Sequence, residues 1–283
     1  MSESRDDAVR TAVRLNYGAV ARRAAGAEVK GCCQRAPEVR TPCCAPEPGR
    51  AAQVSCGLGY SEDDLAAAPE GANLGLGCGN PTAIAALKPG ERVLDLGSGG
   101  GFDCFLAARQ VGPEGHVVGV DMTPDMVDLA QRNAAESGLA NVEFRLGQIE
   151  ALPVTDSSID VVLSNCVVNL SPNKAAVFRE AFRVLAPGGR LSISDIVATA
   201  PLPDSLTESL DAISGCIGGA ESVEAIVDWL MAAGFVDVRV EVAESSREAI
   251  ADWAPGQGAE RFVASAAIEA HKPADGQAAC CGR

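Results

Sequence analysis

The sequence feature that most constrains the fold is a regular alternation of short apolar strands and helices that begins at residue 91. Segments of helical character separate most of the strand-like runs. This alternation predicts an α/β fold with a parallel, doubly wound sheet. The five expected strands of the alternation are 92–96, 116–121, 142–146, 159–164 and 190–195.

Turn and capping residues mark the helices between these strands. Thr123 supplies an N-cap, Pro124 takes the favoured first helical position, and Gly138 ends the same helix. A later helix is expected to open at Ser171 and to run to Leu185, where a Pro-Gly-Gly sequence follows. The crossovers in the alternation are therefore expected to be helical.

A glycine-rich loop follows the first strand directly. Its sequence is Asp95-Leu-Gly97-Ser-Gly99-Gly-Gly101, and it precedes a helix, which is where a doubly wound sheet binds a nucleotide. Glycine allows a sharp turn and lets a ligand approach without a Cβ clash. The dinucleotide fingerprint G-x-G-x-x-G is absent, because Phe102 stands at its last position. The loop therefore predicts a nucleotide-type ligand that carries no pyrophosphate.

The segments outside this alternation are less regular. Residues 6–25 have helical periodicity, and a short helix is expected to start near Ser61. Residues 26–60 hold four prolines and five cysteines, which predicts a loop or mobile flap. Beyond residue 200 we expect helices at 203–214 and 223–233 and strands near 236–243 and 260–267. The predicted divisions are a helix and cysteine-rich flap at 1–60, a core at 61–200, an α+β portion at 201–270 and a disordered tail at 271–283.

The charge distribution disfavours two classes of partner. The net charge is −15, and residues 51–283 hold 14 Lys and Arg against 32 Asp and Glu. So acidic a body repels nucleic acid and anionic membranes, although the same charge also serves simply to keep a protein soluble. We therefore expect neither nucleic acid nor membrane as partner. A monomer is also expected, while the sequence leaves the oligomeric state open.

The chain contains eleven cysteines, an odd number that argues against a complete disulfide framework. The first residues have no apolar run of the kind found in secretory signals, and no stretch has the roughly 20 apolar residues of a membrane span. We therefore expect a cytoplasmic protein whose thiols are mostly reduced.

Three cysteines stand in probable loops beside the predicted nucleotide site. These are Cys78, Cys166 and Cys216, and the chain has only two histidines to accompany them. Soft thiolates without imidazoles suit a thiophilic atom better than zinc hydrolysis. The pairs Cys32-Cys33 and Cys43-Cys44 lack the C-x₂-C spacing of a zinc ribbon, which argues against a structural zinc site there.

The glycine loop resembles the S-adenosylmethionine loop of class I methyltransferases. In that family the first acid of the loop, matched by Asp95, lies near the methionine moiety. Asp121 ends the second strand, where a carboxylate accepts the ribose hydroxyls, and residues 147–150 match the segment that flanks the adenine. The resemblance implies a donor site formed by Asp95, Gly97, Ser98, Gly99, Gly101, Asp121, Met122, Ile149, Glu150 and Asn165.

The segments around the three cysteines narrow this resemblance. Residues 75–81, 164–170 and 215–219 look like the signature segments of arsenite S-adenosylmethionine methyltransferases, and the resemblance runs from about Tyr60 to Val242. Tyr17-Gly18 followed by Cys32 also matches the N-terminal arrangement of that family. The family resemblance implies a Rossmann-like fold, arsenic(III) bound by the three cysteines, and a C-terminal portion that encloses the arsenic.

The resemblance also implies a redox cycle. Each methylation formally oxidises arsenic, so thiols must return two electrons. In this family pattern Cys32 and Cys78 form a disulfide that an external thiol such as thioredoxin or glutathione reduces. The substrate would be arsenite or its thiol conjugate. The arsenic lone pair attacks the donor methyl group in line, so that no general base is required and positioning supplies most of the catalysis.

Two other functions and several residue roles remain open from the sequence. One alternative is a carbon methyltransferase acting on a quinone or sterol, and another is a non-catalytic metalloid-binding protein. Cys104, in the helix after the glycine loop, is better explained as a small buried hydrophobe. The number of methyl groups transferred and the preference between arsenic and antimony are also open. No role is assigned to the remaining cysteines, Cys33, Cys43, Cys44, Cys56, Cys280 and Cys281.

Overall fold

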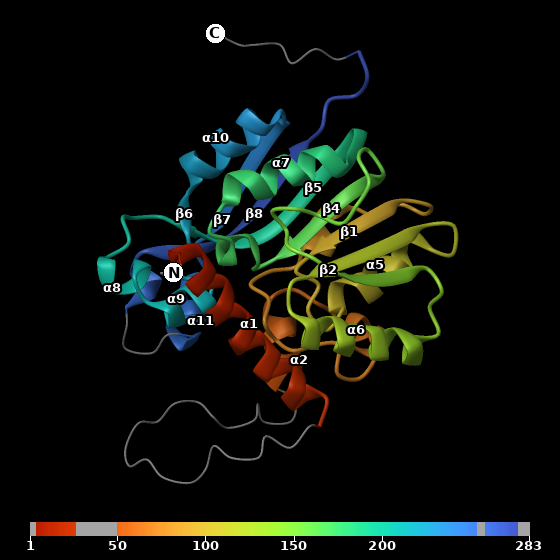
Figure 1. Cartoon of the computed structure of the whole chain (residues 1–283), viewed down its shortest axis with the longest axis horizontal. Helices are drawn as coiled ribbons and strands as arrows, with labels where there is room; N and C mark the ends of the chain where they lie inside the picture. Colours follow the sequence, from red (N-terminus) through yellow and green to blue (C-terminus); the bar gives the residue numbers. More distant parts are fainter. Residues whose placement is uncertain (1–3, 27–49, 254–257, 277–283) are drawn as a thin grey trace.

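A computed structural model describes residues 4–26, 50–253 and 258–276. Its centre is one sheet with the strand order β3-β2-β1-β4-β5-β8-β7, and a short β6 pairs with β5 (Figure 1). All five strands predicted between residues 92 and 195 are present. The strands are β1 Arg92–Leu96, β2 His116–Asp121, β3 Val142–Leu146, β4 Ile159–Asn165, β5 Leu185–Ala198, β6 Glu221–Ser222, β7 Val236–Ala243 and β8 Val263–His271.

Helices connect the strands and cover both faces of the sheet. Helices α5 and α6 contribute to the apolar layer on one face, and α7 and α10 contribute to the layer on the other. In the described residues the α-helices are α1 Arg5–Ala24, α2 Arg50–Gly57, α3 Glu62–Ala67, α4 Pro81–Ala85, α5 Phe102–Val111, α6 Pro124–Ser137, α7 Lys174–Val184, α8 Asp204–Thr207, α9 Leu210–Ser214, α10 Val223–Ala233 and α11 Ser246–Trp253. Short 3₁₀ turns are η1 Val168–Leu170 and η2 Ala259–Arg261.

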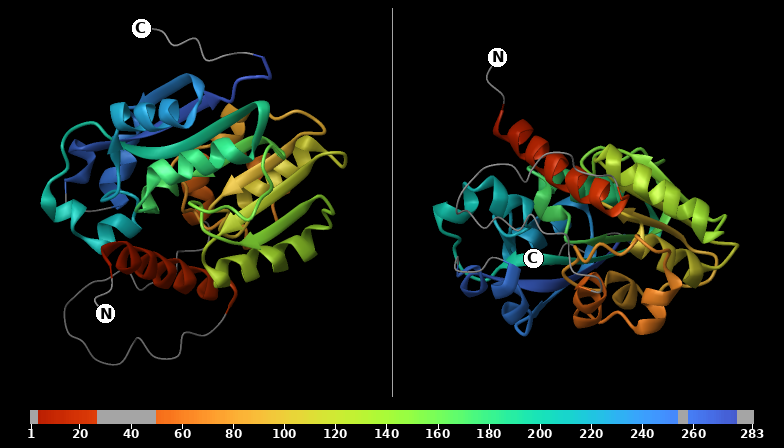
Figure 2. Two further views of the ribbon diagram at one scale, coloured as in Figure 1. Left: turned by 45° about the horizontal axis from the view of Figure 1, so that its top comes forward. Right: turned by 90° about the horizontal axis from the view of Figure 1, so that it is seen from below.

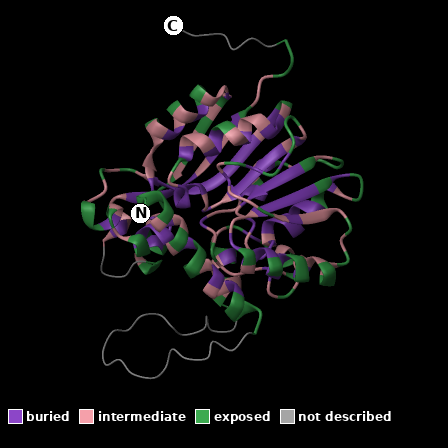
Figure 3. Cartoon of the chain, in the orientation of Figure 1, coloured by how far each residue is buried: buried purple, intermediate pink, exposed green. Residues whose placement is uncertain are grey.

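Alternation of side chains along the strands builds the two apolar layers. On β1, Val93 packs in the layer with α5, whereas Leu94 packs in the layer with α7. Phe105 of α5 and Phe178 of α7 are among the largest fully buried side chains. Burying an aromatic side chain of this size contributes about 2–3 kcal/mol. Figure 3 shows the resulting pattern, with the central strands buried and the outer helix surfaces exposed.

The sheet is mixed rather than wholly parallel, which corrects one part of the sequence prediction. The β1, β2, β3, β4 and β5 pairings are parallel, but β8 runs antiparallel to both β5 and β7. Mixed sheets of this kind are common where an α/β sheet ends in antiparallel strands. The sheet continues past residue 200 through β7 and β8. The domain boundary predicted at that residue stays a prediction.

Local structure departs from the sequence prediction at three further places. The predicted helix at 203–214 consists of two short helices, because Ser209 caps α9 and interrupts the run. Residues 50–57 form helix α2, although they belonged to the predicted loop. Strand β5 starts at Leu185 and includes the Pro-Gly-Gly sequence that was expected to precede it. Residues 27–49 and 277–283 of the predicted flap and tail lie outside the described residues.

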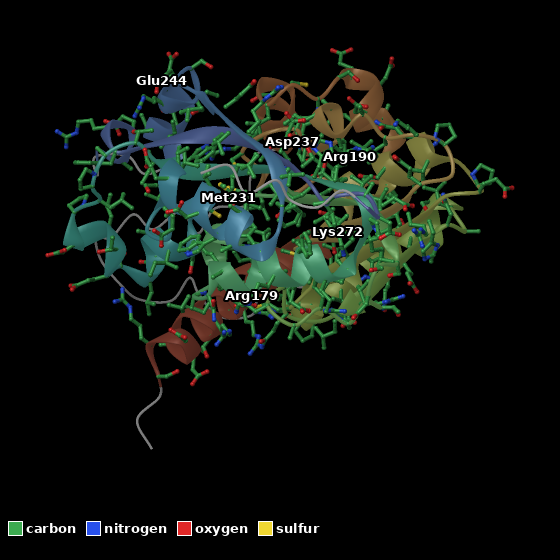
Figure 4. All side chains as sticks on the ribbon, turned by 90° about the horizontal axis from the view of Figure 1, so that it is seen from above. Arg179, Arg190, Met231, Asp237, Glu244 and Lys272 are labelled. Carbon is green, nitrogen blue, oxygen red and sulfur yellow. The ribbon has the colours of Figure 1, made fainter. Side chains whose placement is uncertain are left out.

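The amino end of β5 is tied to its neighbours by two cations. Arg190 donates to Glu91 at 2.7 Å and to the Ala85 carbonyl at 2.7 Å. Lys272 donates to the Leu185 carbonyl at 2.6 Å. Both cations lie at the same end of the sheet (Figure 4). These hydrogen bonds fix the amino end of β5 to its neighbours. They leave the carboxyl ends of the parallel strands available for a ligand site.

Helix α1 crosses the carboxyl ends of the strands, from α9 to α6 (Figures 1 and 2). Arg22 near its end pairs with Asp125 of α6, and Tyr17 donates to the Ser214 carbonyl of α9 at 3.3 Å. On one face of this helix Val9 and Val13 are buried, and Tyr17 and Val20 are partly buried. None of the helices within the described ranges has the length and apolar character that crossing a membrane requires.

Candidate active site

The glycine loop turns sharply between β1 and α5. Gly97 and Gly99 have φ of +69° and +51°, values that favour glycine over residues with a side chain. The Val120 carbonyl of β2 accepts from Gly97 N at 2.7 Å, which anchors the loop to the neighbouring strand. A Cβ at Gly99 would meet no atom within 4 Å, so this residue faces open space. The loop therefore presents backbone to a pocket.

Asp121 at the end of β2 is hydrogen-bonded to this loop. Its Oδ2 accepts from Gly99 N at 3.1 Å, and its Oδ1 accepts from Thr123 N at 2.8 Å. Burial raises the pKa of the Asp121 carboxyl, while these backbone donors lower it. Each carboxylate oxygen has further acceptor capacity, so Asp121 is able to accept hydroxyl donors from a ligand as well.

One pocket collects nearly all of the predicted donor-site residues. It is lined by Asp95, Gly97, Ser98, Gly99, Asp121, Met122, Ile149, Glu150 and Asn165. Gly101 is the predicted residue that does not line it. Gly101 lies at the N-cap of α5 with φ of +92°, and a Cβ there would meet Phe105 and Phe144 at 2.7 Å. Its role in the structure is to let the helix start close to β3.

The pocket offers both apolar walls and acidic side chains to a ligand. Met122 and Ile149 are apolar walls, while Asp95, Asp103 and Asp121 supply carboxylates. The apolar walls could pack against a flat base. The carboxylates could pair with a cation or accept from hydroxyl groups. Arg10 also lines the pocket, and its Nε is a buried atom without a hydrogen-bond partner in the described part of the chain. A ligand that accepts this donor would satisfy it.

Asn165 at the end of β4 fastens the loop that carries Cys78. Its Oδ1 accepts from Cys78 N at 3.0 Å, and its Nδ2 donates to the Gly79 carbonyl at 2.9 Å. The side chain of Asn165 is thus occupied by protein contacts in addition to lining the pocket. It holds the 77–79 segment against the strand end.

A buried carboxylate and a phenol, both missed by the sequence analysis, complete this arrangement. Tyr60 donates to Asp103 at 2.6 Å, and Asn165 donates to the other oxygen of Asp103 at 3.2 Å. Burial raises the pKa of both Tyr60 and Asp103. An aspartate in the first turn of the helix after a glycine loop was the available sequence signal for Asp103, whereas nothing near Tyr60 indicated this pairing.

Cys166 and Cys216 share an uncommon backbone conformation. Their φ values are +60° and +63°, which is a strained region for residues with a side chain. The Cys216 thiol donates to the Cys166 carbonyl at 2.8 Å, and both side chains are buried. Left-handed backbone at both positions therefore brings two segments that are 50 residues apart into contact.

Cys78 completes the group of three thiols that the sequence predicts. All three belong to one buried cluster beneath α1, and Cys166 lies between the other two. Of the three, only Cys166 lines the pocket. The Cys78 thiol donates to the Ser194 carbonyl at 3.5 Å, the same carbonyl that accepts from Cys166 N at 2.8 Å. The structure thus brings the three predicted sulfurs together at one edge of the pocket.

The environment of these thiols keeps them protonated. Burial raises the pKa of Cys78 to about 11. For Cys166, the hydrogen bond with Cys216 lowers the pKa, but the hydrogen bond with Cys78 and burial raise it by more. The hydrogen bond with Cys166, followed by burial, raises the pKa of Cys216. The sulfurs are therefore soft ligands that give up a proton only when a thiophilic atom replaces it.

Asp195 is a residue of this site that the sequence analysis missed. A carboxylate oxygen of Asp195 and the sulfurs of Cys78 and Cys166 all lie within 4.8 Å of one another. Asn169 donates to Asp195 Oδ1 at 2.9 Å, and burial raises the pKa of Asp195 to about 6. The signal was its place at the predicted end of strand five, since ligands in such sheets bind outside the carboxyl ends of strands.

Three further residues bear on this site: Cys32, Cys104 and Tyr17. Cys32 lies outside the described residues, so its pairing with Cys78 stays a prediction. Cys104, expected to be a buried hydrophobe, is fully buried and donates to Asp95 at 3.2 Å. Tyr17 lines the pocket, and burial together with the nearby Cys216 and Cys166 raises the pKa of its hydroxyl.

The arrangement combines a nucleoside pocket with soft ligands at its edge. Cys166 belongs to both, so a thiophilic atom on its sulfur would lie next to whatever occupies the pocket. No lysine or histidine stands among the described lining residues, and burial raises the pKa of the carboxyls of Asp95, Asp103 and Asp121 there. The geometry suits transfer of a group between two bound reactants that need orientation more than proton transfer.

Comparison with a family model identifies a methyltransferase domain over residues 87–234. The curated arsenite methyltransferase of Halobacterium salinarum is 53% identical over 232 residues, which cover 82% of this chain and 59% of that protein. That of Aquipseudomonas alcaligenes is 47% identical, over 51% of this chain and 43% of that protein. The chain thus matches less than two thirds of the length of either relative.

A solved structure extends this similarity to three dimensions. The crystal structure of an arsenic(III) S-adenosylmethionine methyltransferase from Chlamydomonas reinhardtii has 34% sequence identity and a TM-score of 0.60. The match covers 83% of this chain and 76% of that one. A phosphoethanolamine N-methyltransferase from Haemonchus contortus, in complex with S-adenosyl-L-methionine, has a TM-score of 0.58 at 21% identity and so shares the fold.

Proposed function

The chain belongs to the arsenite S-adenosylmethionine methyltransferases, within the methyltransferase-domain family, and we propose that it transfers methyl groups from S-adenosylmethionine to thiolate-bound trivalent arsenic. The observation that carries this proposal is the position of Cys166. This residue lines the donor pocket and also belongs to the buried cluster of Cys78 and Cys216. A metalloid bound there lies beside the methyl donor.

The donor pocket would hold S-adenosylmethionine through three kinds of contact. The glycine loop and Asp95 receive the methionine end, Asp121 receives the ribose hydroxyls, and Ile149 lies against the adenine. When bound, the donor supplies an electrophilic methyl group on a sulfonium. The open space at Gly99 and the unpartnered Arg10 Nε support this assignment.

The thiols would bind arsenic by exchange with its hydroxyl groups. Each thiol proton leaves with one hydroxyl as water, so that a sulfur–arsenic bond replaces an oxygen–arsenic bond. Cys78, Cys166 and Cys216 can hold arsenic as a pyramid with its lone pair directed away from the sulfurs. That lone pair then forms the new carbon–arsenic bond while the carbon–sulfonium bond breaks. Orientation by the sulfurs is the main contribution of the protein.

Return of arsenic to the trivalent state requires two electrons. We propose that two thiols supply them by forming a disulfide, with Cys78 as one partner and Cys32 as the other. An external thiol such as glutathione or a thioredoxin would then reduce this disulfide. Because the cycle needs free thiols, a reducing compartment such as the cytoplasm is the expected location. We also propose that a monomer carries out the reaction, since both reactant sites are built from one chain.

The test is incubation with arsenite, labelled S-adenosylmethionine and a thiol reductant, followed by speciation of the arsenic. The proposal predicts labelled methylarsenicals and their loss when the donor is omitted. Binding of arsenite without any labelled methylarsenical would instead indicate a metalloid-binding protein. The test also gives the number of methyl groups transferred, and parallel incubation with trivalent antimony gives the preference between the two elements.

The rival function, carbon methylation of a quinone or sterol, is separated by one variant. A carbon methyltransferase would not depend on Cys166, because its acceptor is not held by sulfur. The decisive outcome would be a Cys166→Ser variant that still methylates an isoprenoid quinone in the absence of arsenite. That outcome would support the rival and contradict the proposal.

A further inference from the structure

The tightest set of possible metal ligands in the described residues is not the three-cysteine set. The sulfurs of Cys78 and Cys166 and a carboxylate oxygen of Asp195 all lie within 4.8 Å of one another, and all three residues are buried. Cys216 contacts Cys166 but is not a member of this group. Arsenic(III) prefers sulfur, so a carboxylate at this position has no evident use in binding it.

We propose that Cys78, Cys166 and Asp195 form a binding site for a thiophilic divalent cation such as Zn²⁺ or Cd²⁺. Two thiolates and one carboxylate are a ligand set that Zn²⁺ accepts in tetrahedral sites, with one position left for a water or a further thiol. The Cys216 thiol is a candidate for that position, since it donates to the Cys166 carbonyl at 2.8 Å.

The spacing is compatible with coordination after a small contraction. In a tetrahedral site with Zn–S bonds of about 2.3 Å, neighbouring sulfurs are about 3.8 Å apart. Ligand atoms within 4.8 Å therefore need to approach by about 1 Å or less. The left-handed backbone at Cys166 and the shared Ser194 carbonyl already direct the two sulfurs to the same place.

Hydrogen bonds from the protein fix the orientation of the Asp195 carboxylate, as such bonds do for the ligands of metal sites. Asn169 donates to Oδ1 of Asp195 at 2.9 Å from its side chain and to Oδ2 at 3.3 Å from its backbone. Ile196 N also donates to Oδ1 at 2.8 Å. Three donors fix the carboxylate plane, and a carboxylate with about four acceptor positions has capacity left for a cation.

Charge also favours a divalent ion at this place. When both thiols lose their protons to solvent, the three ligands carry three negative charges, which a divalent cation reduces to one. The cation would reach the site from the donor pocket, because Cys166 lines it. A cation bound at this site would occupy the sulfurs that the proposed function requires. The cation would therefore inhibit methylation.

The test is a titration with Cd²⁺ alone, followed by the thiolate-to-cadmium absorption band in the ultraviolet. The full chain is used with serine at positions 32, 33, 43, 44, 280 and 281, so that thiols outside the described residues do not contribute. We expect one Cd²⁺ per chain. Asp195→Asn should weaken Cd²⁺ binding about tenfold or more, and Cys166→Ser should remove the tight site. Asp128→Asn, which removes an exposed aspartate on α6, is the matched control and should bind Cd²⁺ as the parent does.

Unchanged Cd²⁺ affinity in a folded Asp195→Asn chain overturns the proposal, and so does a tight site that survives in Cys166→Ser. If Asp195→Asn does not fold, X-ray absorption of the Zn²⁺-loaded parent decides the question. A shell of mixed sulfur and oxygen supports Asp195 as a ligand, and a shell of sulfur alone contradicts it. Neither measurement uses arsenite or S-adenosylmethionine, so failure of the proposed function would leave these outcomes unaffected.

Discussion

The donor side and the thiol side of the site are built in opposite ways. The donor side centres on segments that follow one another closely, from Asp95 through the glycine loop to Asp121 and Met122, and Ile149, Glu150 and Asn165 join them from later strand ends. The thiol side joins four distant positions: Cys78 in a loop, Cys166 directly after β4, Asp195 within β5, and Cys216 in the turn after α9. One side is held by local backbone geometry, and the other by contacts between distant parts of the chain.

This difference predicts that a substitution on one side impairs ligand binding on that side alone. The donor side rests on β1, β2 and the hydrogen bonds of Asp121. The thiol side rests on the Asn165 side chain and on the Ser194 carbonyl, neither of which has a hydrogen bond to residues 95–101 in the described part of the chain, although Asn165 also donates to Asp103 of the donor pocket. Changes to one side should therefore leave ligand binding on the other largely intact, as expected for sites that share few contacts.

The largest expected effect comes from Cys166→Ser. The change removes the sulfur that the two sides share, and it should lower arsenite methylation at least about 1,000-fold. Binding of S-adenosylmethionine, measured by calorimetry, should change less than about twofold, because serine keeps the backbone and most of the side-chain volume. Cys56→Ser replaces an exposed thiol of α2 and serves as the control, with activity close to that of the parent. Loss of donor binding in Cys166→Ser would break the proposed independence.

The second prediction concerns the reactivity of the thiols with an alkylating agent. Because the pKa of Cys78 is raised to about 11, the Cys78 thiol is deprotonated in only about one molecule in 1,000 at pH 8. Cys78 should therefore react at least about 100-fold more slowly than the exposed Cys56. The thiolate is favoured as pH rises, so the Cys78 rate should grow about tenfold per pH unit up to pH 11. Peptide mass spectrometry after timed iodoacetamide labelling measures both rates, and equal rates at pH 8 would contradict the buried cluster.

The contrast between the two sides also explains what the sequence could predict. The order Asp95, Gly97, Gly99 and Asp121 follows from local patterns, because a strand, a glycine loop and a helix are adjacent in the chain. These residues line the pocket as expected. Gly101 belongs to the same pattern yet faces Phe105 and Phe144, since the pattern does not indicate the direction in which each glycine faces.

The thiol side could be predicted in part, from the placement of three cysteines beside the glycine loop and from the family resemblance. Motifs marked Cys78, Cys166 and Cys216 individually, but no periodicity indicates that Asp195 lies within 4.8 Å of two of them. Likewise, the contact of Tyr60 with Asp103 joins residues 43 positions apart and leaves no local pattern. Only the rule that strand ends converge at one edge of a sheet pointed toward Asp195.

The third prediction tests the donor side with Asp121→Ala. The change leaves Gly99 N and Thr123 N without their acceptor and removes a carboxylate from the pocket. Because each lost buried partner costs about 1–3 kcal/mol, affinity for S-adenosylmethionine should fall about 30-fold. Arsenite binding, followed by equilibrium dialysis, should stay within about twofold, because Asp121 contributes no ligand to the thiol cluster. A parallel loss of arsenite binding would show that the two sides depend on each other.

The smallest effect is expected from Gly79→Ala, and it tests how tightly the thiol side is packed. A Cβ at Gly79 would lie 2.6 Å from Ser194 Oγ and 2.7 Å from Ser194 Cβ, closer than such atoms pack. The loop must therefore move away from β5, and it takes Cys78 with it. Overpacking of this kind costs about 1–3 kcal/mol, and we expect arsenite affinity to fall about fivefold while donor affinity is unchanged. Gly57→Ala, at a helical position where a Cβ meets no atom within 4 Å, is the matched control. If Gly79→Ala binds arsenite as the parent does, the thiol side tolerates displacement, and its dependence on distant contacts is weaker than the structure indicates.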